Sequence, residues 1–236
     1  MKKILVVIAI SLLSLTSAYA GSFQVGVQGG LMEIKGKGVE TDVGGTADAS
    51  NRSKEVSHDT FSGSIFAEYS LDSFSYSSDG NGLTIGIGHM PGSADISNSA
   101  FKRTDTELSK TGSAAVTANI VNRSAQAEIE NVMNYYVEVP VYGMFYGKIG
   151  YTEMDVNTLE TGDSSISSTY GNSTVSGTNL GFGAKGNFTG GLGWKVAYEI
   201  QDFDTLSIAS SQTDKGNRVE ADLDTTHLNF SLGYKF

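Results

Sequence analysis

Residues 228–236 of the sequence read LNFSLGYKF. Leucine, phenylalanine and tyrosine occupy every second position, and asparagine, serine, glycine and lysine lie between them. Successive side chains of a β-strand point to opposite faces of its sheet. The stretch therefore predicts a strand with one bulky apolar face and one face of small or polar residues. Whether the rest of the chain repeats this pattern decides the fold class.

The same alternation recurs in further segments of about ten residues, the length of a tilted strand that crosses a membrane. A soluble β-sandwich also alternates, but its second face meets water and favours long polar side chains. Here glycine and serine crowd that face, as a narrow closed barrel requires near its axis. The segments are 23–31, 61–70, 83–88, 133–139, 145–152, 179–188 and 192–201, and with the last one they predict an all-β, eight-stranded antiparallel transmembrane β-barrel.

Aromatic residues lie near the ends of these apolar faces, as expected of girdles at the two membrane–water interfaces. They are Phe23, Tyr69, Phe145, Tyr151, Phe188, Trp194, Tyr198, Tyr234 and Phe236.

The connections between segments alternate in length. Short ones span 72–81, 140–143 and 189–191, and long ones span 35–59, 91–126, 157–178 and 202–222. An up-and-down barrel with short periplasmic turns and long extracellular loops has this asymmetry, and it places both termini on the periplasmic side. A hairpin hidden around 112–122 would raise the strand number from eight to ten, and the sequence leaves this alternative open.

The first twenty residues predict a signal peptide. Lys2 and Lys3 precede an apolar run over 4–15, and the small residues Ala18 and Ala20 predict cleavage before Gly21. A membrane anchor is the alternative, but the run is shorter than the ~20 residues that span a bilayer as a helix. We therefore expect residues 21–236 to form the exported barrel domain.

Composition and motifs exclude several other functions. The sequence has no cysteine, which rules out thiol chemistry and cysteine-bound metals, and its net charge of -10 argues against nucleic-acid binding. The G-x-G-x-x-G pattern over 181–186 lies within an alternating strand, whereas a dinucleotide site needs a following helix. No Ser/His/Asp set can be assembled, and His58, His89 and His227 lack ligand spacing. We expect no enzymatic activity, no cofactor and no metal.

The final nine residues also carry a resemblance to a known family. Their pattern looks like the C-terminal strand signal that the barrel-assembly machinery of bacteria recognises. The whole segment 21–236 resembles the small barrels of the OmpA transmembrane domain, OmpX and opacity-protein group. The resemblance implies a location in the cell outer membrane, with outer-membrane lipids, lipopolysaccharide and the assembly machinery as partners. The signal residues are Leu228, Phe230, Leu232, Tyr234 and Phe236.

Charged residues on the small face predict an ion-pair network inside the barrel, because an unpaired charge in a narrow lumen costs several kcal/mol. A gate or ion path is one interpretation, and a structural plug is the other; eight strands leave room only for side chains. Cations at Lys102, Arg103, Lys110 and Arg123 are candidates for contact with lipid phosphates. The expected network residues are Glu68, Glu138, Lys148, Lys185, Lys195, Glu199 and Lys235.

Two functions remain open from the sequence. One is a structural or surface-interaction role through the extracellular loops, with a plugged lumen. The other is a narrow porin-like channel for ions or small solutes. The residues do not indicate which ligand the loops would bind.

Overall fold

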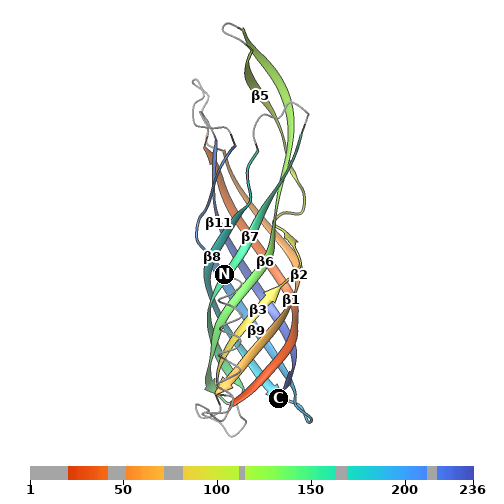
Figure 1. Cartoon of the computed structure of the whole chain (residues 1–236), viewed down its shortest axis with the longest axis vertical. Coiled ribbons are helices and arrows are strands. Elements are labelled where there is room, and N and C mark those ends of the chain that lie inside the picture. Colours follow the sequence, from red (N-terminus) through yellow and green to blue (C-terminus); the bar gives the residue numbers. More distant parts are fainter. Residues whose placement is uncertain (1–20, 42–51, 72–81, 112–114, 163–168, 212–216) are drawn as a thin grey trace.

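The chain forms one antiparallel sheet that closes into a ring of eight strands (Figure 1). The computed structural model describes residues 21–41, 52–71, 82–111, 115–162, 169–211 and 217–236, so the predicted cleavage site at Ala18 and Ala20 lies outside the described residues. The predicted eight-stranded barrel is confirmed. The ring consists of β1 (Gly21–Thr41), β2 (Arg52–Leu71), β3 (Leu83–Met90), β6 (Ala115–Tyr142), β7 (Phe145–Gly162), β8 (Ser173–Asn187), β9 (Leu192–Phe203) and β11 (Arg218–Lys235).

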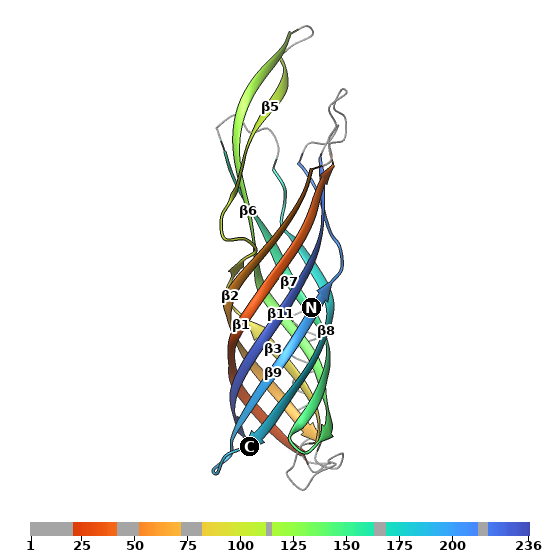
Figure 2. The ribbon, with the colours of Figure 1, turned by 180° about the vertical axis from the view of Figure 1, so that it is seen from behind.

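The first and last strands close the ring. β1 pairs with β2 on one side and with β11 on the other, and the two strands lie side by side in Figure 2. Val27 is opposite Leu232, and the amide of Phe236 donates a hydrogen bond of 2.8 Å to the carbonyl of Phe23. A closed ring leaves no row of unpaired backbone groups, which hydrocarbon could not satisfy. Among the described residues, no helix has the length and apolar character needed to cross a membrane.

The described connections at the end that holds the C-terminus are tight. Two residues join β6 to β7, and Gly143 there has a φ of 56°. Gly190 and Gly191, between β8 and β9, have φ values of 87° and 84°. Glycine adopts this left-handed region without the steric cost that a Cβ atom brings. The third predicted short connection, 72–81, lies outside the described residues.

At the opposite end the strands run far beyond the predicted segments. The predicted loop 35–59 is largely strand, because β1 continues to Thr41 and β2 begins at Arg52. β5 (Phe101–Thr111) pairs with the first part of β6 and forms a projecting hairpin within the predicted loop 91–126 (Figure 1). β5 pairs with no other strand among the described residues, so this hairpin does not enter the ring. The ten-strand alternative is wrong for this reason.

In the described part of the chain, two lines of strands in the outer wall are interrupted. β3 pairs with β2 only as far as the pair His89 and Ile65. Beyond it, β4 (Ala94–Asp95) and β5 continue along β6, and among the described residues no ladder joins them to β2. β10 (Leu206–Ala209) similarly continues the line of β9 along β11. The seam between β2 and β4–β5 is therefore held by side chains.

The lower part of the barrel carries an exposed apolar belt. Val27, Ile149 and Phe230 are among the outward-facing side chains that are half or more exposed. Most of the predicted girdle aromatics are exposed or partly exposed, but Tyr69 is an exception with only 4% of its surface exposed. Its ring folds against Gly21, which has no side chain to hold it away. The belt gives the closed sheet the outward surface that hydrocarbon requires.

Above the belt the two faces of the strands exchange polarity, so that polar side chains face outward and apolar side chains face inward. On β1, the outward positions change to Glu33 and Lys35, while the inward residues Met32 and Ile34 become fully buried apolar side chains. β7 and β11 change in the same way. Charged outward residues mark the point where each strand leaves the hydrocarbon, because a charge facing lipid is costly. The outer half of the barrel is therefore built with apolar side chains inside.

A β-bulge in β6 accompanies this change. Between the pairs Glu130–Asp155 and Met133–Glu153, two residues of β6 oppose one residue of β7. Asn131, within the bulge, has a φ of 53°, a conformation that asparagine tolerates better than most residues. Its side-chain amide donates to the carboxylate of Asp155 at 3.2 Å. The bulge shifts the inward phase of β6, so that Ile129 above it and Asn134 below it both face the lumen.

Candidate functional site

Six charged side chains meet inside the barrel near its short-turn end. Lys195 contacts both Glu68 and Glu138, and its Nζ lies 3.0 Å from Oε1 of Glu138. Lys185 binds the other oxygen of Glu138 at 2.9 Å. A separate pair joins Lys148 to Glu199 at 2.9 Å. Three lysines face three glutamates, so the formal charges of the layer cancel.

Lys235, the seventh predicted network residue, lies apart from this layer. No ion pair of Lys235 occurs among the described residues, and its side chain is partly exposed. The residue is one position from the C-terminus, and its backbone amide donates to the carbonyl of Gly191 at 2.8 Å. At this rim water can solvate the ammonium group, so the lysine needs no buried partner.

Aromatic rings fill the space between the charges. The hydroxyl of Tyr136 donates to Glu68 at 2.6 Å. The ammonium group of Lys148 lies 3.9 Å from the centre of the Tyr136 ring, and that of Lys195 lies 4.5 Å from the centre of the Phe66 ring. A cation over an aromatic face is attracted to the ring's negative centre. The layer thus combines ion pairs with rings that exclude water.

Inward glycines provide the room for these rings. A Cβ atom at Gly86 would overlap the ring of Tyr136, and one at Gly183 would lie 2.7 Å from the ring of Tyr146. Both tyrosines are almost fully buried. The glycine-rich inner face seen in the sequence therefore accommodates large side chains from neighbouring strands.

Neutral side chains, both acceptors and donors, complete the hydrogen bonding of the charged layer. Lys185 donates to the hydroxyl of Thr84 at 3.0 Å. The side-chain amides of Asn179 and Asn229 donate to the two oxygens of Glu199 at 2.9 and 3.3 Å. Buried charges persist only where their remaining hydrogen-bonding capacity is met in this way.

Above the charged layer lies a small polar cavity of about 50 Å³. Gln201 and His227 line it, and each is hydrogen-bonded to the hydroxyl of Thr225, at 3.1 and 3.0 Å. Asn134 also lines it, and its Oδ1 has no hydrogen-bond partner among the described residues. A polar cavity of this size can hold ordered water.

An apolar layer lies inside the barrel above that cavity. Its residues come from β1, β3, β4, β6, β7, β8, β9, β10 and β11, and the sequence analysis did not identify it. The sequence of β7 contains the pattern that would have predicted this layer. Apolar Met154 and Val156 alternate there with Glu153 and Asp155, and the charged residues take the positions that face lipid lower in the strand. The buried members are Met32, Ile34, Met90, Ala94, Ile96, Ile129, Met154, Val156, Val175, Phe203, Leu206 and Leu223.

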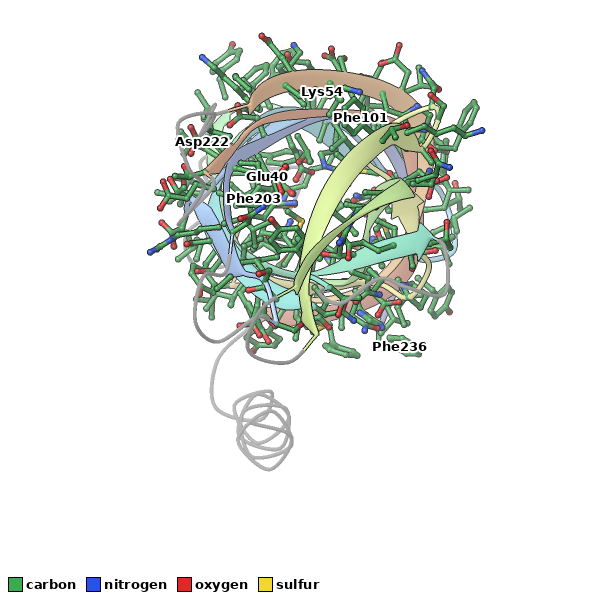
Figure 3. All side chains as sticks on the ribbon, turned by 90° about the horizontal axis from the view of Figure 1, so that it is seen from above. Glu40, Lys54, Phe101, Phe203, Asp222 and Phe236 are labelled. Atoms are coloured by element: carbon green, nitrogen blue, oxygen red, sulfur yellow. The ribbon has the colours of Figure 1, made fainter. Side chains whose placement is uncertain are left out.

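A larger cavity of about 360 Å³ lies in the outer half of the lumen. Viewed from above, Glu40 and Phe203 lie within the ring of strands, whereas Asp222 and Phe236 lie at its outside (Figure 3). The lining is mostly aliphatic and includes Val56 and Ile208.

The cations expected near lipid phosphates do not act as one group. Arg123 lines the outer cavity, which contradicts its expected place at the membrane boundary. The bulge in β6 explains the difference, because it changes which residues of that strand face inward. Lys102 is exposed on β5, and the side chains of Arg103 and Lys110 lie outside the described part of the structure.

The five residues of the predicted assembly signal all face outward on β11. Leu228, Phe230, Leu232, Tyr234 and Phe236 are exposed, and the ring of Tyr234 contacts that of Phe236 edge-on at 5.1 Å. Their role in assembly stays a prediction. In the part of the chain that the structure describes, no group of three or more histidine, aspartate or glutamate residues could hold a metal ion.

Comparisons with known proteins agree with this architecture. No protein-family model and no curated protein sequence matches the chain. The outer-membrane protein OprG of Pseudomonas aeruginosa is similar over 92% of this chain and 97% of its own, with 14% identity and a TM-score of 0.40. AlkL, an outer-membrane protein studied in DMPC bilayers, is similar over 92% of both chains, with 12% identity and a TM-score of 0.44.

An outer-membrane protease is also among the similar structures. OmpT of Escherichia coli is similar over 91% of this chain and 97% of its own, with 10% identity and a TM-score of 0.43. Identities this low describe the fold alone. The closed ring and the outward apolar belt themselves make the chain an eight-stranded β-barrel with the outer surface of a membrane-spanning one.

Proposed function

We propose that the protein is a sealed outer-membrane barrel with a structural or surface-interaction role, exerted through its outer strands and loops. The observation that carries this proposal is the charged layer across the lumen. Lys195 links Glu68 of β2 to Glu138 of β6, and Lys185 links Glu138 to β8. These side chains are nearly enclosed, with at most 11% of any of them exposed.

The stacking of layers supports the same proposal. An ion passing along the axis would meet the apolar layer around Ile34 and Met154 before it reached the charged layer. Entering apolar surroundings without a partner costs an ion several kcal/mol. Two unlike barriers in series therefore favour a plug over an ion path.

The shape of the outer half supports a role at the surface. The β5–β6 hairpin projects well beyond the ring, and β1 and β2 remain paired up to Glu40 and Arg52 (Figure 1). Regular hydrogen bonding makes these extensions stiffer than irregular loops would be. They can present their side chains away from the lipid. The proposal assigns no catalytic activity to the chain.

Single-channel recording tests the sealed lumen. The protein refolded into a planar bilayer is expected to give no steady conductance steps. The variant Glu138→Ser, Lys195→Ser and Met154→Ser removes one charge of each sign from the charged layer and one large side chain from the apolar layer, so that both barriers are weakened, and it is expected to conduct. Lys35→Ser is the matched control on the outside of β1, where the lysine side chain is 56% exposed, and it should stay silent. Steady steps from the unmodified protein would support the porin-like channel instead.

A further inference from the structure

We propose that the outer cavity is a binding site for one small, uncharged, apolar molecule. This inference goes beyond the surface role proposed above, because it concerns the inside of the outer half of the barrel. The cavity measures about 360 Å³, which falls within the range typical of small-molecule sites.

The lining is apolar on all sides of the barrel. Val56 comes from β2, Val156 from β7, and Leu206 and Leu223 from β10 and β11. Ile96 and Val156 of the apolar layer described above also line the cavity, so the two are continuous with each other. A concave apolar surface of this kind binds by removing its own area and that of the ligand from water.

Lipid cannot cover these residues. On the same stretch of β1, Glu33, Lys35 and Lys37 point outward between the inward positions Ile34 and Gly36. Charged side chains on the outer face place this level of the barrel above the hydrocarbon. The aliphatic lining is therefore apolar surface in an aqueous region, and contiguous surface of this kind marks binding sites.

The charges at the cavity indicate that the ligand is neutral. Lys54 and Arg123 line the cavity together with Glu40 and Glu160, so two cations face two anions. The hydroxyl of Tyr170 donates to Glu40 at 2.7 Å, and its backbone amide donates to Glu160 at 3.2 Å. A charged ligand would lose its hydration on entering the cavity, and the lining has no excess of the opposite charge to compensate for that loss.

Lys54 also holds the wall of the cavity together. Its ammonium group lies 4.0 Å from the centre of the Phe101 ring, across the seam where no ladder joins β2 to β5 among the described residues. Figure 3 shows the two side chains near each other at the outer end of the barrel. This cation–π contact closes the lining at a place where, among the described residues, backbone pairing does not.

Photolabelling in lipid nanodiscs tests the site. The probe is an uncharged medium-chain alkyl diazirine, and the labelled residues are located by mass spectrometry. We expect labelling at inward residues such as Ile96, Ile208 and Leu223, in addition to belt residues such as Leu31. An excess of unlabelled alcohol of the same chain length should abolish the inward labelling and leave the belt labelling, because only a site saturates. Inward labelling that is absent or cannot be competed would overturn the proposal.

Two tryptophan variants localise the effect. Ala221→Trp places a large side chain into the cavity, and Glu220→Trp is the matched control one residue away, at a side chain that is 56% exposed outward. Inward labelling should be lost in the first variant and kept in the second, with belt labelling equal in both as proof of folding. Equal inward labelling in both variants would contradict the site. If Ala221→Trp fails to fold, competition on the unmodified protein decides.

A charged competitor tests the neutral character of the ligand. An alkyl sulfonate of the same chain length should compete roughly ten-fold more weakly than the alcohol, because the cavity offers its negative head group no net positive charge. Equal competition by the two compounds would overturn this part of the proposal.

Discussion

Lys185 of β8 and Glu138 of β6 form an ion pair with 2.9 Å between Nζ and Oε2, although β7 separates their strands. The pair spans 47 residues of sequence and joins two walls of the barrel that share no backbone hydrogen bonds. Only 11% of the lysine side chain and 1% of the glutamate side chain are exposed. A charge held in this position depends on its partner, and the barrel's stability should respond accordingly.

Removing the shared carboxylate should destabilise the barrel strongly. Glu138→Ala leaves Lys185 and Lys195 buried without this partner, and we expect a loss of about 3–5 kcal/mol in the free energy of unfolding. Urea unfolding in lipid vesicles, followed by the fluorescence of Trp194, measures it; this is the one tryptophan in the sequence. The solvent-accessible control Glu33→Ala should change stability far less, because water screens its contacts. Equal effects of the two variants would show that the buried pairs contribute little.

Replacing the whole charged group should restore most of that loss. The variant Glu68→Gln, Glu138→Gln, Lys185→Met and Lys195→Met removes two charges of each sign and keeps an acceptor for the hydroxyl of Tyr136. Exchanging complete buried ion pairs for uncharged side chains is often neutral or stabilising, because no charge remains to be desolvated. The same unfolding experiment should give a stability well above that of Glu138→Ala. A fourfold variant as unstable as the single one would contradict this account.

The space left by an inward glycine is a second determinant of packing inside the barrel. Gly86→Val would force its side chain into the ring of Tyr136, and we expect a loss of about 1–3 kcal/mol from overpacking. Gly63→Val is the matched control, because a Cβ atom there meets nothing within 4 Å. Thermal unfolding followed on detergent gels compares the two variants. Similar melting of both would refute the packing role assigned to Gly86.

Two outward carboxylates of the outer half should respond to pH with opposite signs. Partial burial, followed by repulsion from Asp202, raises the pKa of Asp224, whereas hydrogen bonds from Lys35 and Ser57 lower the pKa of Glu33. A raised pKa in the folded state means that stability falls as pH rises through the carboxyl range near about 4. A lowered pKa means that stability falls as pH decreases through that range.

Amide variants separate these two effects. At neutral pH, Asp224→Asn should be more stable than the unmodified protein and Glu33→Gln less stable, and both differences should vanish in acid below the carboxyl range. Hydrogen exchange of the backbone amides in the outer strands, measured at neutral pH and in acid, gives both stability differences. Differences that persist in acid would assign the effects to causes other than ionisation.

The membrane-spanning half could be predicted well from the sequence because one rule holds there: apolar side chains face the lipid, and small or polar side chains face the lumen. Along 227–236 and 192–201 lipid touches every second side chain, so the alternation alone separates the outward Phe230 and Val196 from the inward Ser231 and Lys195. The set of inward charges followed from the same rule. The sequence predicts that Glu138 or Glu68 pairs with Lys148, Lys185 or Lys195, but not which individual pairs form, because Lys195 and Glu68 meet through the ring closure and the tilt of strands far apart in the sequence.

The outer half was not predicted, because there the polarity of the two faces is reversed and apolar side chains face inward. Above the belt, Glu153 and Asp155 face outward and Met154 and Val156 inward, so a prediction that requires apolar residues to face lipid ends its alternating segment at 152, although β7 continues to Gly162. The bulge at Asn131 further changes the phase within β6. The outer cavity depends on the reversed polarity, on the bulge and on the projecting strands. None of these features was predicted, so Arg123, which lies in the predicted loop 91–126, was expected at the membrane boundary.

The closure of the sheet between its first and last strands is the central claim, and a disulfide tests it most directly. Val27 is opposite Leu232 on β11 and also opposite Ile65 on β2. Opposed residues of an antiparallel pair lie at the Cα separation that a disulfide needs, and the native sequence contains no cysteine to interfere. Oxidation of the variant Val27→Cys with Leu232→Cys in lipid should form an intramolecular bridge as completely as Val27→Cys with Ile65→Cys. A bridge in the second variant but not in the first would show an open sheet and contradict the barrel.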